Sequence, residues 1–150
     1  MTKSSDILLR AQERAREANL PYAGALLPQE AHDLLHLVHG SRLIDVRTQA
    51  ELDWVGFVPD SLHIEWSTYP NGLHNPDFIK QIQSEATQET LLFFMCRSGA
   101  RSHAAAKLAI ESGFVNSYNV LQGFEGDKDE HGHRNTLGGW RHAGLPWKQG

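Results

Sequence analysis

The sequence predicts a single α/β domain in which helices cover both faces of a mainly parallel sheet. The chain has 150 residues, 40% of them hydrophobic, which is enough for one core without disulfides or metals. Short strand-like segments alternate along the chain with segments whose apolar residues recur at helical spacing. Such alternation is typical of a parallel sheet between layers of helices. The segment 91–95 is apolar throughout, as expected of a strand buried on both faces.

The first predicted element is a helix over residues 1–19, within an N-terminal extension over 1–22. We expect this extension to pack on the main domain, residues 23–150. The apolar residues at helical spacing that would make this contact are Ile7, Leu8, Ala11 and Ala15. A second helix is predicted to begin near Pro28, because proline favours the first helical turn, and to end near Gly40.

The remaining predicted elements alternate between strand and helix. Strands are predicted at 23–26, 42–46, 61–64, 91–95 and 117–121. Helices are predicted at 49–55, 76–84 and 102–112. Residues 123–139 are polar and rich in glycine, which predicts an exposed loop. In sheets of this kind ligands bind beyond the carboxyl ends of the strands.

The charge and the cysteine content of the chain limit the functions that it can have. Fourteen basic and eighteen acidic residues give a formal charge of −4, which argues against a nucleic-acid or anionic-membrane partner. No apolar stretch approaches the roughly 20 residues of a transmembrane helix. With Cys96 as the single cysteine, no internal disulfide can form, and any sulfur chemistry must end on an outside nucleophile. We therefore expect a cytoplasmic protein in a reducing compartment.

Cys96 lies between a predicted strand and a predicted helix. Backbone N–H groups of the intervening loop and of the first helical turn converge on such a position and bind anions. Helix N-termini and neighbouring arginines lower the pKa of a cysteine from about 8.5 to roughly 3.5–7.5. The alternative is that Cys96 is an inert core cysteine. An inert core position does not require the residues that follow it here, Arg97, Gly99 and Arg101. We expect Cys96 to be a nucleophile.

The loop at Cys96 resembles the active loop of the single-domain rhodanese-like sulfurtransferases. In that family a cysteine is followed by two residues, glycine, one residue, arginine and then serine or threonine. Here the loop reads Cys96-Arg97-Ser98-Gly99-Ala100-Arg101-Ser102. The segment 43–51 is similar to a second family motif, an Asp-Val-Arg sequence with a glutamate four residues further on, and contains Asp45, Arg47 and Glu51.

The resemblance extends over residues 27–140 and departs from the family in places. Phe57 stands where the family usually has histidine, Asp60 stands where it has glycine, and 123–139 is longer than in a minimal domain. The resemblance implies a three-layer fold with a five-stranded parallel sheet. It also implies that the cysteine accepts a sulfane sulfur as a persulfide and passes it on, without a cofactor or metal.

Residue roles follow from this resemblance. Cys96 is the expected nucleophile and sulfur carrier, and Arg97 and Arg101 are expected to attract a small anionic donor such as thiosulfate. The acceptor is expected to be cyanide, a thiol or a protein. Ser102 either donates its hydroxyl to the sulfur or simply begins the helix. The expected donor-binding residues, whose amides surround the persulfide, are Arg97, Ser98, Gly99, Ala100, Arg101 and Ser102.

Asp45 and Arg47 are expected to lie beside the loop as supporting residues. Both are interpreted mainly as members of structural ion pairs, with Arg47 pairing with Glu51 at helical spacing.

Two other functions remain open. Phosphatases and arsenate reductases of similar fold have five residues between cysteine and arginine, usually with histidine before the cysteine. Here there are four residues, and Met95 precedes Cys96, which disfavours a phosphate-sized ring of amides. A redox-sensing or partner-binding module without turnover is the other alternative. Residues 127–132 begin like a calcium loop, but Gly138 occupies the position of the closing glutamate, so no metal site is expected.

Overall fold

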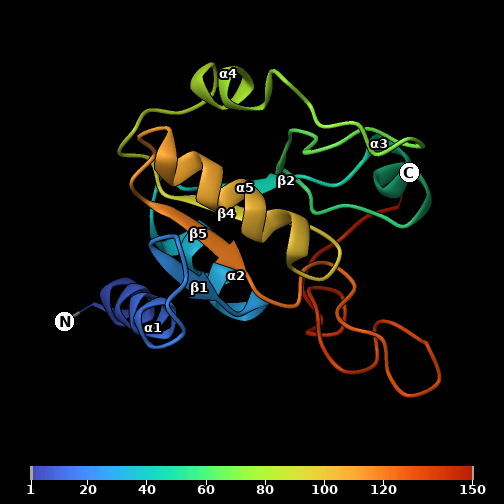
Figure 1. Ribbon diagram of the computed structural model, residues 1–150. Helices are drawn as coiled ribbons and strands as arrows, with labels where there is room; N and C mark the ends of the chain where they lie inside the picture. The colour runs from blue at the N-terminus through green and yellow to red at the C-terminus, as the bar shows by residue number, and fades with distance from the viewer. Residues whose placement is uncertain (1, 150) are drawn as a thin grey trace.

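The computed structural model describes residues 2–149, which form a five-stranded sheet and five helices (Figure 1). In chain order the elements are α1 (Lys3–Glu17), β1 (Gly24–Leu26), α2 (Pro28–Leu37), β2 (Arg42–Asp45), α3 (Gln49–Trp54), β3 (Leu62–His63), α4 (Phe78–Gln83), β4 (Leu92–Met95), α5 (Ala100–Glu111) and β5 (Ser117–Val120). All strand pairs are parallel, in the order β1-β5-β4-β2-β3. The predicted α/β class with a five-stranded parallel sheet is confirmed.

Helices cover both faces of the sheet, and β4 contributes side chains to both layers. Phe93 and Met95 pack in the cluster that includes α1 and α2, whereas Leu92, Phe94 and Cys96 pack in the cluster that includes α4 and α5. Successive side chains of a strand point to opposite faces. Because both faces are covered, every residue of β4 is buried, which explains the absence of polar alternation in this segment.

Helix α1 is attached to β1 and α2 by apolar and ionic contacts. Ile7, Ala11 and Ala15 are buried, as their spacing predicts. The guanidinium of Arg14 donates to both carboxylate oxygens of Glu30 on α2, at 2.6 and 2.9 Å, and to a backbone carbonyl of β1. None of the helices in residues 2–149 is long and apolar enough to cross a membrane.

The carboxyl ends of the central strands bring the candidate residues together. Asp45 ends β2, and Cys96 follows β4, its neighbour in the sheet. Helix α5 begins at Ala100, two residues earlier than predicted, because Gly99 adopts a left-handed conformation (φ +119°) and caps the helix. The loop between β4 and α5 is therefore short.

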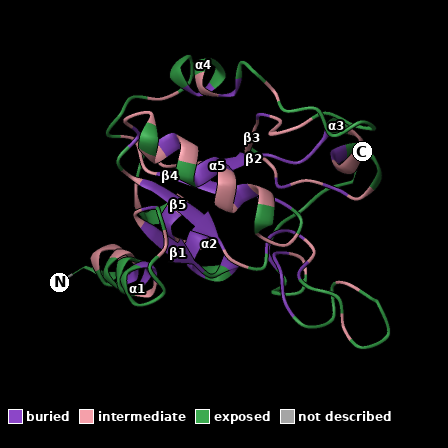
Figure 2. Ribbon diagram, viewed as in Figure 1, coloured by how far each residue is buried: buried purple, intermediate pink, exposed green. Residues whose placement is uncertain are grey.

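The segment 123–139 is not the uniformly exposed loop that its composition predicts. Its tip is exposed, but its two ends are buried against the domain (Figure 2). Phe124 and the adjoining Trp140 are fully buried. Gly123 has a φ of +62°, and a side chain there would overlap the carbonyl group of Cys96. Several glycines of this segment thus permit close backbone packing rather than solvent exposure.

The exposed tip of this loop is stabilised by Asp129. Its carboxylate accepts hydrogen bonds from the amides of His131 and His133 and from the hydroxyl of Thr136. These bonds lower the pKa of Asp129, the largest contribution coming from the amide of His133. The Asp129 carboxylate therefore links three residues of the loop tip to one another.

Candidate active site

The sulfur of Cys96 lies at the N-terminal end of α5. Its side chain is 1% exposed. The amide of Gly99 donates a hydrogen bond to Sγ at 3.1 Å, and the Ser102 hydroxyl lies 3.3 Å from Sγ. Within residues 2–149 these are the hydrogen-bond partners of the sulfur. Of the expected loop residues, Gly99 and Ser102 thus contact the unmodified sulfur, Gly99 through its amide.

A chain of hydrogen-bonded side chains leads away from Ser102. Its hydroxyl lies 2.6 Å from Oδ1 of Asn119, to which it donates. Nδ2 of Asn119 donates to the hydroxyl of Tyr22 at 3.1 Å, and this hydroxyl lies 2.9 Å from Nδ1 of His103. Burial raises the pKa of Tyr22, although the bond from Asn119 opposes this shift, so the phenol remains protonated at neutral pH.

Sequence reasoning missed Asn119, Tyr22 and His103 as neighbours of the site. The bond between Asn119 and Tyr22 joins residues 97 positions apart, and the contact between Tyr22 and His103 joins residues 81 positions apart. No local pattern signals these contacts. They exist because β1, β5 and β4 are adjacent in the sheet.

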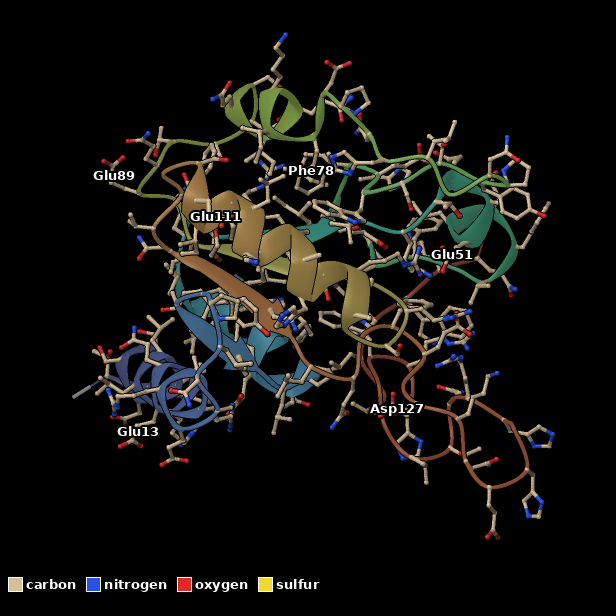
Figure 3. All side chains as sticks on the ribbon, in the orientation of Figure 1. Glu13, Glu51, Phe78, Glu89, Glu111 and Asp127 are labelled. Atoms are coloured by element: carbon tan, nitrogen blue, oxygen red, sulfur yellow. The ribbon has the colours of Figure 1, made fainter. Side chains whose placement is uncertain are left out.

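Arg101 is held by Glu51 across the site. Its guanidinium donates two parallel hydrogen bonds to the carboxylate, at 2.7 and 2.9 Å, so that α5 is tied to α3. Figure 3 shows Glu51 between α3 and the N-terminal end of α5. Burial alone would raise the pKa of Glu51, but the hydrogen bonds and charge of Arg101 outweigh it and lower this pKa. Glu51 also completes the N-terminal cap of α3 with Thr48.

The predicted pair between Arg47 and Glu51 is therefore wrong. Arg47 precedes Thr48, the N-cap of α3, and so lies outside the helix. The i,i+4 neighbour relation holds only within a helix, which is why spacing alone misassigned the partner. Arg47 instead pairs with Asp45.

The Asp45–Arg47 pair is completely buried beneath the site. The guanidinium of Arg47 donates to the carboxylate at distances from 2.7 to 3.2 Å and to the carbonyl of Gly56 at 2.8 Å. It also stacks on the ring of Phe124, 4.2 Å from the centroid. Arg47 thereby connects the end of β2 with the segments that follow α3 and β5.

The segment after β5 supports the Cys96 loop through backbone hydrogen bonds. The amide of Phe124 donates to the carbonyl of Cys96 at 2.8 Å, and the amide of Glu125 donates to the carbonyl of Arg97 at 2.9 Å. These bonds fix the loop to the segment that follows β5. This support was not visible in the polar composition of the segment.

A solvent-open cavity of about 450 Å³ lies beside the loop. Arg97 is exposed at this cavity, and within residues 2–149 no carboxylate lies within 4.0 Å of its guanidinium. The cavity is lined by Thr48, Ala50, Glu51, Trp54, Val55, Tyr69, Arg97, Arg101 and Glu125. In the same part of the chain no group of three or more His, Cys, Asp or Glu residues is arranged to hold a metal ion.

A second cavity, of about 320 Å³, lies at the other end of the sheet. It is bounded by α2, the start of β2 and residues 58–61, and its polar lining includes His32, Arg42 and Asp60. Burial lowers the pKa of His32. Its lining includes no residue of the Cys96 loop, whereas the lining of the first cavity includes Arg97 and Arg101 of that loop; Cys96 itself lines neither of these two cavities.

Comparison with known proteins agrees with this geometry. The family model of the rhodanese-like domain matches residues 27–130. The uncharacterized protein RP600 of Rickettsia prowazekii is 35% identical over 123 residues, which cover 79% of this chain and 92% of that protein. Rv0390 from M. tuberculosis, whose crystal structure is known, is 40% identical with a TM-score of 0.78, over 86% of this chain and 99% of that one.

A more distant structure has the same fold. The polysulfide-sulfur transferase homodimer of Wolinella succinogenes superposes with a TM-score of 0.59 at 23% identity, covering 97% of this chain and 90% of that one. The family match covers well over half of the residues and includes both the Cys96 loop and the Asp45–Arg47 segment. The chain therefore belongs to the family of rhodanese-like domain proteins.

Proposed function

We propose that this protein is a sulfurtransferase that carries a sulfane sulfur on Cys96 as a persulfide. The observation that supports this most directly is the position of Sγ, which accepts the amide of Gly99 at 3.1 Å at the start of α5. A thiolate, or a persulfide anion formed on it, is stabilised by such donors and by the helix dipole. Arg97, which has no carboxylate partner within residues 2–149, adds positive charge beside the loop, and the guanidinium of Arg101, which is paired with Glu51, lines the same cavity.

The proposed reaction has two redox-neutral displacements. The Cys96 thiolate attacks the outer sulfur of thiosulfate, the S–S bond of the donor breaks, and its electron pair leaves with sulfite. An acceptor such as cyanide then attacks the terminal sulfur of the persulfide. The S–S bond on Cys96 breaks, its electron pair returns to Sγ as thiolate, and thiocyanate departs. A small thiol or a protein thiol would accept the sulfur in the same way.

The burial of Cys96 favours sulfur transfer over general redox sensing. Sensor cysteines are usually solvent-accessible, because an oxidant must reach the thiolate. Here the sulfur is shielded by its own loop and by Ser102, and the adjacent cavity, which Arg97 and Arg101 line, is the approach that we propose for a reactant. We further propose a cytoplasmic location, since a lone nucleophilic thiol suits a reducing compartment.

The test is intact-mass measurement of the purified, reduced protein. Incubation with thiosulfate should add the mass of one sulfur atom, and cyanide should then remove it with formation of thiocyanate. The control is Cys96→Ser, a nearly isosteric change that should abolish both steps while leaving the circular dichroism spectrum unchanged. Full turnover by Cys96→Ser would place the chemistry elsewhere.

A further inference from the structure

The hydroxyl of Ser102 lies beside the sulfur but donates its hydrogen elsewhere. A serine hydroxyl has one hydrogen to donate. Oδ1 of Asn119 lies 2.6 Å from Oγ, which is at the short end of the range for such bonds, and the Gly99 carbonyl lies 3.1 Å away. Ser102 therefore directs a lone pair, and not a hydrogen, at Sγ of Cys96, 3.3 Å away. A thiol can donate to this lone pair, whereas a thiolate gains nothing from it.

The hydrogen bonds beyond Ser102 all run in the same direction. Nδ2 of Asn119 donates to the hydroxyl of Tyr22 at 3.1 Å and, over a longer distance of 3.4 Å, to the carbonyl of Gly99. Because the Tyr22 hydroxyl accepts this bond, its own hydrogen is left for Nδ1 of His103, 2.9 Å away. Each side chain in this chain of bonds therefore donates to the next one, away from the sulfur.

The same side chains can also form this chain in the opposite direction. When the amide of Asn119 turns over, Nδ2 donates to Oγ of Ser102 and Oδ1 accepts from Tyr22. The Ser102 hydrogen is then free to donate to Sγ of Cys96. Nδ1 of His103 must in turn carry a hydrogen and donate it to Tyr22, which a change of tautomer or of protonation provides. His103 is half-buried, so its ring can exchange this hydrogen with solvent.

We propose that Asn119 and Tyr22 are positioning residues that decide whether Ser102 donates a hydrogen bond to the sulfur of Cys96. The chain of bonds runs away from the sulfur while Cys96 is a thiol, and towards it when Cys96 becomes a thiolate or a persulfide anion. The anion then receives two hydrogen bonds, one from the amide of Gly99 and one from Ser102. For its role in catalysis this proposal rests on the sulfur transfer proposed above, in which both anions occur.

Two substitutions should affect the ionisation of Cys96 differently, although both remove a buried hydrogen bond. In Tyr22→Phe the turned amide would have no donor for Oδ1 and would bring this oxygen near the Gly99 carbonyl, whereas the observed amide keeps that carbonyl as an acceptor. Ser102 therefore stays bonded to Asn119, and the thiolate loses a donor. In Asn119→Ala the Ser102 hydrogen has no Oδ1 to bond, so it can turn to the sulfur.

The test is the pH midpoint of thiolate formation, followed by the ultraviolet absorbance of the reduced protein with the matching Cys96→Ser variant as the blank. Tyr22→Phe and Ser102→Ala should each raise this midpoint by roughly 0.5 to 1, because a hydrogen bond to a charged group is lost. Asn119→Ala should leave the midpoint unchanged or lower it. Adding Tyr22→Phe to Ser102→Ala should cause no further shift, because Tyr22 acts through Ser102. This double variant keeps the test decisive if Asn119→Ala does not fold.

The matched control is Tyr118→Phe, which also removes one buried hydroxyl. The hydroxyl of Tyr118 bonds Nε2 of Gln12 at 2.9 Å, but Tyr118 packs in the core cluster of α1 and α2, whereas Tyr22 and Cys96 pack in the other cluster. Tyr118→Phe should leave the midpoint unchanged. A shift as large as that of Tyr22→Phe, or additive shifts in the double variant, would overturn the proposal.

The midpoint is measured without any sulfur donor, so it separates this proposal from the proposed function. Thiosulfate loading of the same variants is followed by intact mass. A native protein that thiosulfate loads, but whose midpoint does not respond to Tyr22→Phe, would refute the chain of hydrogen bonds alone. Midpoint shifts of the expected sign in a protein that thiosulfate does not load would support this chain and refute the sulfurtransferase function.

Discussion

The buried pair of Asp45 and Arg47 provides a quantitative test of what supports the site. Both side chains are fully buried, and the carboxylate receives its side-chain hydrogen bonds from Arg47 alone among the described residues. Arg47→Met would leave a buried carboxylate without its cation, and Asp45→Leu would leave a buried guanidinium without its anion. Removing one partner of such a pair costs about 3–5 kcal/mol. For a chain of this length that corresponds to a fall in Tm of roughly 6–20 °C.

The double variant, Asp45→Leu with Arg47→Met, removes both charges and replaces them with apolar side chains of similar bulk. We expect it to cost less than either single change, because no unpaired charge remains. It still loses the bond to Gly56 and the contact with Phe124, so it should not exceed the native stability by much. Urea titrations at neutral pH, followed by circular dichroism, measure the three free energies of unfolding.

Two results would refute this reasoning. If each single variant costs less than about 1 kcal/mol, the pair is not effectively desolvated. If the double variant costs as much as the sum of the singles, the two residues act independently and the observed contacts carry no coupling energy.

Three further predictions concern the surroundings of Cys96. Asn119→Ala leaves two buried hydroxyls without their amide partner and should lower the free energy of unfolding by about 2–4 kcal/mol. Tyr22→Phe should lower it by only about 1 kcal/mol. Equal losses of the two variants in urea titration would argue against the chain of hydrogen bonds. The pKa of Glu51 is lowered in the folded protein, so its carboxylate contributes stability above its unfolded pKa of about 4.3, and this contribution disappears as the pH falls through the folded pKa. In Glu51→Gln the free energy of unfolding should therefore fall less steeply below about pH 4 than in the native protein. An unchanged dependence on pH in this range would show that the ion pair contributes nothing. Insertion of one glycine between Gly99 and Ala100 widens the loop, and a displacement of roughly 1 Å should reduce sulfur transfer about a hundredfold; a parental rate in the folded variant would show that loop size does not select sulfur over phosphate.

The sequence by itself determined the fold class and the position of Cys96 between a strand and a helix, because both depend on local patterns. The apolar segment 91–95, the polar loop after it and the following helical pattern place Cys96 at the carboxyl end of a buried strand. The structure confirms this order of elements. The family motifs could be read because the short loop from Cys96 to Ser102 is contiguous in the chain.

Only the tertiary structure decided which side chains meet across the site. Spacing assigned Glu51 to the wrong arginine, since its partner, Arg101, lies fifty residues away on another helix. Composition indicated an exposed loop at 123–139, yet its ends are buried because Phe124 packs under Arg47 and donates to the Cys96 carbonyl. The contacts of Asn119 with Ser102 and Tyr22 likewise require β5 to lie between β1 and β4. Such contacts depend on the spatial order of the strands, which hydrophobic periodicity along the chain does not encode.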